Sequence, residues 1–106
     1  MQSDKIRTEH WRMYVGGELV GLLHLATPDQ AWSTCTFEPL EGWEAVRPLF
    51  DVQNDAAKEG FPADKGWATK EIRDRGVELR PLESEAAPVI EPFMIYVDGD
   101  QARFRP

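Results

Sequence analysis

The sequence predicts an α+β fold: a mostly antiparallel sheet of about five to six strands, with one or two helices packed on one face. The predicted order is three strands, two helices and three strands. Residues 11–37 form three strand-like runs joined by two turns. Apolar residues at helical spacing follow in 41–75. A second strand-forming block, 89–105, contains the hairpin signal Asp98-Gly99.

The first hairpin has two possible registers around Gly16-Gly17. A two-residue loop would place Val15 opposite Glu18, whereas a three-residue loop would place it opposite Leu19. We favour the three-residue loop because it gathers the large apolar side chains on one face, and a one-residue slip would move half of them away. The predicted core face comprises Trp11, Met13, Val15, Leu19, Leu23, Leu25, Cys35 and Phe37.

The third strand follows a second turn. Thr27 to Gln30 has the proline and aspartate typical of a turn, and Ala31 to Phe37 alternates apolar and polar residues. Pairing Leu25 with Ser33 would bring Phe37 across a glycine of the neighbouring strand, which is a favourable cross-strand contact.

The first helix is expected to be short. Residues 41–50 place Trp43, Val46 and Phe50 on one helical face. An interior proline costs about 3 kcal/mol, so Pro48 predicts a short helix or a kink near 45–47. The polar residues 51–64 are expected to form a loop or weak helix.

The second helix is predicted over 63–75. Asp64 is its expected N-cap and Gly76 its end, with Trp67 and Ile72 buried. A strand over 77–82 would lie at a sheet edge, because Pro81 cannot donate to a ladder.

The last block is expected to close the sheet. Residues 93–97 are almost continuously apolar, as for a strand with both faces in contact. The hairpin returns with Ala102 and Phe104 on one face.

Length and charge limit the class of protein. The chain has 106 residues and a formal net charge of −7. It is expected to form a single domain over 1–106, with 1–9 frayed. A nucleic-acid partner is disfavoured because phosphate binding requires clustered Lys and Arg. The acidic excess lies in 38–59 and 83–100, where it serves solubility or faces a basic partner.

Cysteine content and hydropathy point to the cytoplasm. Cys35 is the only cysteine, so no internal disulfide is expected. The N-terminus lacks the apolar region of a signal peptide, and no run approaches the roughly 18 apolar residues of a membrane helix. We expect a cytoplasmic protein without membrane contact. A monomer and a homodimer both remain open.

The face opposite the predicted core carries the candidate binding residues. The favoured hairpin register places two histidines opposite one another on this face. Aromatic and hydroxyl side chains share the face with them. These residues are His10, Tyr14, His24, Trp32 and Thr34. Two imidazoles fall short of the three or four ligands that zinc normally takes, so no metal site is expected.

The sequence supports catalytic residues less strongly than it supports the binding residues above. Cys35 lies on the predicted core face, away from His24, and reads as a buried structural cysteine. Asp98 and Asp100 flank Gly99 at a hairpin tip, where turn chemistry explains them. Phosphate-loop, nucleophile-elbow and zinc-protease motifs are absent. We therefore expect no catalytic residue and no cofactor.

Two runs carry a family resemblance. Trp32 to Phe50 and Met94 to Phe104 resemble small uncharacterised bacterial proteins of similar length. The matching motifs are structural: a strand, a helix with an internal proline, and a closing Asp-Gly-Asp hairpin. The resemblance implies one complete domain and assigns no activity.

Two functions remain open. The first is a non-enzymatic acidic binding or interaction module for a protein or small ligand, of which an immunity-like or inhibitor role against a basic protein is one form. The alternative is a small enzyme or ligand carrier with a pocket lined by His24, His10, Tyr14 and Thr34. The lack of a catalytic constellation favours the first.

Overall fold

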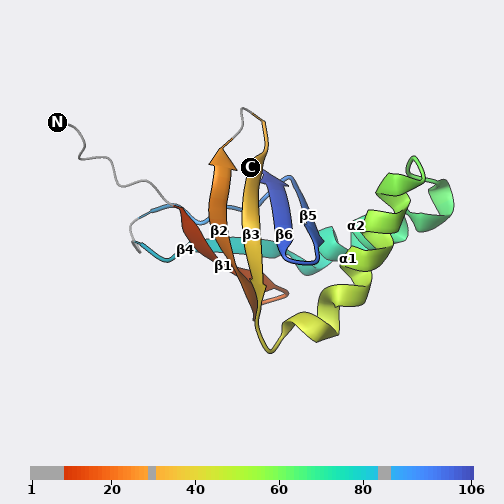
Figure 1. The fold of residues 1–106 in the computed structure, drawn as a ribbon. Coiled ribbons are helices and arrows are strands. Elements are labelled where there is room, and N and C mark those ends of the chain that lie inside the picture. The colour runs from red at the N-terminus through yellow and green to blue at the C-terminus, as the bar shows by residue number, and fades with distance from the viewer. Residues whose placement is uncertain (1–8, 29–30, 84–86) are drawn as a thin grey trace.

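A computed structural model describes residues 9–28, 31–83 and 87–106 of the chain. It contains one six-stranded antiparallel sheet in the order β4-β1-β2-β3-β6-β5, and two helices (Figure 1). The predicted α+β class and the predicted order of elements are confirmed. The prediction of a frayed N-terminus and part of the turn predicted at 27–30 lie outside the described residues. The elements are β1 (His10–Val15), β2 (Glu18–Pro28), β3 (Ser33–Pro39), α1 (Trp43–Lys58), the 3-10 turn η1 (Ala63–Lys65), α2 (Trp67–Arg75), β4 (Val77–Pro81), β5 (Met94–Asp98) and β6 (Gln101–Arg105).

The first hairpin combines the two registers considered from sequence. Its loop has two residues, since Val15 pairs with Glu18, and the predicted three-residue loop is wrong. Both loop glycines have positive φ, as a type I′ turn requires. A bulge at Val20 then adds one residue to β2, so that Trp11 pairs with Leu23 as predicted.

The bulge exchanges two side chains. Val20 is fully buried and Leu19 is only half-buried, whereas the prediction had Leu19 in the core. Beyond the bulge the predicted faces are restored, with Met13 and Leu23 inside. Burial of the large side chains has therefore selected the register, and the turn has been accommodated by the bulge.

The pairing of β2 with β3 differs from the prediction by two residues. Leu25 pairs with Cys35 instead of Ser33, and Leu23 pairs with Phe37. The Phe37 ring nevertheless lies over Gly21, because a Cβ on that glycine would overlap the ring. This even shift keeps the paired side chains up to Leu25 on their predicted faces. Leu25 was predicted in the core but is half-buried, and a second irregularity between Leu25 and Thr27 changes the register at the end of β2.

Helix α1 is longer than expected and continues through Pro48. The proline removes one backbone hydrogen bond, but burial of one helical face outweighs that loss. The stripe extends past Phe50 to Gln53, Asn54 and Ala56, all of which are buried. The predicted short helix and the loop predicted from residue 51 are corrected accordingly.

Helix α2 begins later than predicted. Asp64 lies in the preceding 3-10 turn and does not cap the helix, whose N-cap is Gly66. Trp67 is the first helical residue and is 53% exposed, so its predicted burial is wrong. Ile72 is buried as expected, and Gly76 ends the helix with a positive φ.

The core lies between the sheet and the helices. Side chains from both hairpins and α1 meet there, with Trp43 between Phe37 and Phe50. The buried cluster contains Trp11, Met13, Val15, Val20, Leu23, Cys35, Phe37, Trp43, Val46, Phe50, Ile72, Val77, Leu79, Ile95, Val97, Ala102 and Phe104. No helix in the described part of the chain is long and apolar enough to cross a membrane.

The two edge strands are each partly covered. Beyond β4, Ile90 exchanges two backbone hydrogen bonds with Leu79, at 2.8 and 3.0 Å. Residues 89–93 were predicted to join the last strand block, but β5 begins only at Met94. At the opposite edge, Asn54 of α1 donates to the carbonyl of Val97 in β5. A cavity remains between β4 and β5, and residues of α2 line part of it.

Candidate functional site

The predicted histidine pair exists. Leu25 N–H donates to the Glu9 carbonyl, which makes His10 and His24 a non-hydrogen-bonded pair of the ladder. Side chains approach closely at such pairs. The two Nδ1 atoms lie 2.8 Å apart, so one ring donates and the other accepts.

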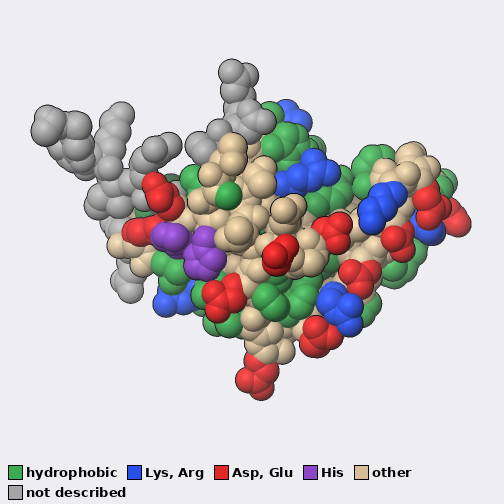
Figure 2. Space-filling model, viewed as in Figure 1, with side chains coloured by type: hydrophobic (Ala, Val, Ile, Leu, Met, Phe, Trp, Pro, Cys, Tyr) green, Lys and Arg blue, Asp and Glu red, His purple; other side chains and the backbone are tan. Residues whose placement is uncertain are grey.

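Carboxylates stand at the outer nitrogens of both rings. His24 Nε2 is 3.4 Å from Glu38 Oε1, and His10 Nε2 is 3.8 Å from Glu83 Oε2. Figure 2 shows the two imidazoles side by side on an open surface with acidic side chains around them. Within the described residues, no group of three or more His, Cys, Asp or Glu side chains could hold a metal ion.

Trp32 forms a separate cluster on the same face of the sheet. The Arg103 guanidinium lies 4.9 Å from the centroid of the Trp32 ring and 4.7 Å from that of Tyr96. The two rings are 5.9 Å apart. Arg103 is exposed, so the stack is a cation–π contact at the surface.

The remaining two predicted residues lie apart from both clusters. Tyr14 lies beneath Arg80, with the guanidinium carbon 4.8 Å from the ring centroid. Thr34 lines a small cavity of about 220 Å³ with Tyr96 and Lys58. Of the five predicted site residues, only His10 and His24 contact one another among the interactions described.

Cys35 has the environment of a structural cysteine. Its side chain is almost fully buried, and this burial raises the pKa of the thiol to about 11. The thiolate is the nucleophilic form of cysteine, so the group is protonated and unreactive near neutral pH.

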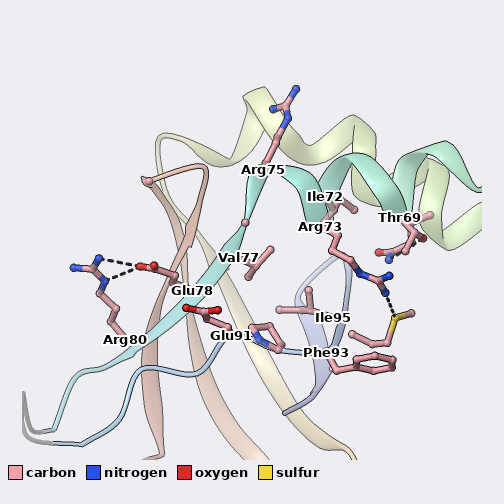
Figure 3. Close-up of a pocket in the computed structure, with 15 residues that line it drawn as sticks. Thr69, Ile72, Arg73, Arg75, Val77, Glu78, Arg80, Glu91, Phe93 and Ile95 are labelled. Carbon is pink, nitrogen blue, oxygen red and sulfur yellow. Dashed lines mark hydrogen bonds and ion pairs between the residues drawn. The ribbon is translucent and has the colours of Figure 1, made fainter.

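A larger cavity lies between β4 and β5, where sequence reasoning placed no site (Figure 3). Its volume of about 570 Å³ is within the range of small-molecule sites. The floor is apolar and the rim is charged. The lining residues are Gly17, Gln53, Thr69, Ile72, Arg73, Arg75, Gly76, Val77, Glu78, Arg80 and 91–95.

The charges of the cavity come from a few side chains. Arg75 and Arg80 point away from it in Figure 3 and pair with Glu71 and Glu78. Arg73 instead lies beside the cavity, with Nη2 3.5 Å from the sulfur of Met94 and its guanidinium over the Phe93 ring. Among the described residues, neither Arg73 nor Glu91 has an ion-pair partner.

Gln53 provides the buried polar group of this cavity. It is 2% exposed, and its side-chain nitrogen donates to Thr69 Oγ1 at 3.3 Å. Its side-chain oxygen is buried and has no partner among the described residues. Leaving such an acceptor unpaired costs about 1–3 kcal/mol of stability.

Comparisons with protein-family models, curated proteins and solved structures find no match for this chain. The groups that the cavity presents are an apolar floor, one unpaired cation, one unpaired anion and a buried amide oxygen. These groups can hold a ligand through apolar contact, ion pairing and hydrogen bonding.

Sequence reasoning missed this cavity for a definite reason. Gln53 belongs to α1, Arg73 to α2 and Ile95 to β5, and only the tertiary fold brings them together. One signal was present: Gln53 continues the apolar stripe of Val46 and Phe50, and a polar residue on a buried face needs a partner.

Proposed function

We propose that this protein is a non-enzymatic binding module that holds a ligand in the cavity between β4 and β5. The observation that carries the proposal is a cavity of about 570 Å³ that joins an apolar floor to two charged side chains, Arg73 and Glu91. Neither side chain has an ion-pair partner among the described residues. A ligand with an apolar body and a charged group would match both features.

The surfaces around Gln53 support the same role. Ile72, Val77 and Ile95 offer apolar contact, and Phe93 at the rim is 63% exposed. Exposed aromatic rings are frequent anchors in binding sites. Arg73 adds a cation without an ion-pair partner among the described residues, in a protein whose net charge is −7.

A titration with 1-anilinonaphthalene-8-sulfonate tests the proposal, because this probe joins an apolar ring system to one anionic group. We expect saturable fluorescence enhancement at a single site in the native protein. Thr69→Phe would fill the cavity and Arg73→Gln would remove the cation, so each should weaken the binding about tenfold.

Arg103→Gln is the matched control. It removes an exposed arginine that also contacts aromatic rings but lies outside this cavity. The control should bind the probe as the wild type does. Thr69→Phe removes the hydrogen-bond partner of the Gln53 nitrogen and should unfold at a lower urea concentration than the wild type, so far-UV circular dichroism must show that it is folded under the titration conditions. Absence of saturable binding, or equal binding by Thr69→Phe, would overturn the proposal.

A second candidate is a protein partner on the open face of the sheet. The stack of Trp32, Arg103 and Tyr96 favours it, because interface hot spots are enriched in these three residue types. Salt-sensitive capture of a basic protein, lost in Trp32→Ala and kept in Trp67→Ala, would support an immunity-like or inhibitor role. The enzyme or carrier alternative would need His10, Tyr14, His24 and Thr34 in one pocket, and only Thr34 lines either cavity described above.

A further inference from the structure

The first edge of the cavity is the backbone of β4. Residues along an edge strand turn their N–H and C=O groups alternately toward and away from the neighbouring strand. Gly16 N–H donates to the Gly76 carbonyl and Leu82 N–H to the His10 carbonyl, so the even-numbered residues of β4 face β1. The backbone groups of Val77 and Leu79 therefore face the gap.

The second edge is the backbone of β5. Phe37 N–H donates to the Asp100 carbonyl, which places Ala102 in a hydrogen-bonded pair with β3 and turns Arg103 toward β5. Tyr96, which pairs with Arg103, faces β6 in return. Ile95 and Val97 consequently direct their N–H and C=O groups away from the sheet.

The chain already fills two of these four edge positions. Ile90 bonds to both backbone groups of Leu79, and Asn54 donates to the carbonyl of Val97. No such bond reaches the outward groups of Val77 or Ile95 from any described residue. Both residues line the cavity, which thus lies between two unfilled strand edges.

The charges beside these edges differ in sign. In Figure 3, the Arg73 guanidinium and the Glu91 carboxylate lie on opposite sides of Val77 and Ile95. An extended segment along the edges would therefore meet a cation near one end and an anion near the other. The free termini of a short peptide carry the matching charges.

We propose that the ligand is a short apolar peptide with free termini, which adds as an extended strand beside Val77 and Ile95. Its carboxylate lies at Arg73 and its ammonium at Glu91. Strand addition supplies donors and acceptors at the spacing that a strand edge presents. The inference rests on the proposed function and names its ligand class.

The test uses the tripeptide Val-Ile-Val and three modified forms of it, titrated while the backbone amide signals of the protein are followed by NMR. The free tripeptide should shift the signals of Val77 and Ile95. Methylation of the amide nitrogen of its isoleucine should weaken binding at least fivefold. One strand hydrogen bond is lost, and the methyl group blocks approach to the strand edge.

The termini are tested by paired changes. Amidation of the carboxylate should weaken binding about tenfold in the wild type but little in Arg73→Gln. Acetylation of the ammonium should weaken binding about tenfold in the wild type but little in Glu91→Gln. Arg103→Gln, on the open face, should leave the affinity for all four peptides unchanged.

The outcomes separate this inference from the proposed function. Saturable binding of the naphthalene sulfonate with no response to any peptide would overturn the peptide class and keep the cavity as a ligand site. Equal binding of the methylated and free tripeptides would overturn strand addition. If neither probe binds, both proposals fail.

Discussion

At the residue scale, Gln53 places a buried amide where an apolar side chain would continue the stripe of α1. Its nitrogen is satisfied by Thr69 and its oxygen is not. Proteins often retain such unfavourable groups at sites that bind ligands, where the cost to stability is recovered on binding.

The stability cost of the unpaired Gln53 oxygen predicts the effect of Gln53→Met. The substitution keeps the side-chain length and removes the unpaired oxygen, so the free energy of unfolding should rise by about 1 kcal/mol. Thr69 is half-buried and can bond to its own helix instead. Urea unfolding measures the gain. A loss of stability would mean that the oxygen is satisfied after all.

Cys35 predicts a dependence of stability on alkaline pH. Burial raises the pKa of its thiol from 9.0 to about 11 in the folded protein, so the folded state favours the protonated form. The resulting stabilisation is complete below about pH 9 and declines as the pH rises toward 11. About 2 kcal/mol should be lost by pH 11.

Comparison with Cys35→Val isolates this effect from the titration of other groups. Urea unfolding of both proteins between pH 8 and 11 should show the wild type losing stability faster than the variant. Parallel curves would contradict the role assigned to burial. The thiol of the wild type should also react slowly with disulfide reagents at pH 8.

At the scale of elements, α1 protects the free edge of β5 through Asn54. The side-chain nitrogen donates to the Val97 carbonyl at 2.7 Å, and both groups are buried. Asn54→Ala should lower the free energy of unfolding by about 1–3 kcal/mol, because it leaves a buried carbonyl unpaired. Asp55→Ala, one residue further on the exposed side of α1, should change stability by less than about 0.5 kcal/mol. Equal effects of the two substitutions in urea unfolding would contradict this account.

The elements show how far sequence reasoning reaches. Strands and their faces were predictable because Trp11, Met13 and Leu23 follow the period of a half-buried strand. The bulge at Val20 was not predictable, because turn geometry and core burial compete there and only their joint solution fixes the register. The predicted α1 is too short because the cost of Pro48 is local, whereas the buried face that continues beyond Phe50 stabilises the whole helix.

The candidate site was predicted less well than the fold. Opposition of His10 and His24 follows from strand register and was foreseen. The stack of Trp32 with Arg103 depends on the pairing of β3 with β6, which is remote in sequence. The cavity depends on α1, α2, β4 and β5 together, and local patterns carry no information on where such elements meet.

At the scale of the whole molecule, the sheet has two edge strands, and each turns unfilled backbone groups of one residue, Val77 or Ile95, toward the same cavity. Ile90 bonds to Leu79 beside Val77, and Asn54 bonds to the Val97 carbonyl beside Ile95. Exposed strand edges are commonly blocked because they invite pairing with other chains. The proposed peptide strand would pair with the edge groups that the chain itself leaves unfilled.

Amide hydrogen exchange at Val77 and Ile95 tests this claim most directly. In the free protein both amides should exchange faster than those of Leu79 and Ile90, which are bonded at 2.8 and 3.0 Å. Saturation with Val-Ile-Val should slow exchange at Val77 and Ile95 and leave Leu79 unchanged. The account is contradicted if Val77 and Ile95 are already as protected as Leu79 in the free protein, or if saturating tripeptide leaves their exchange unaltered.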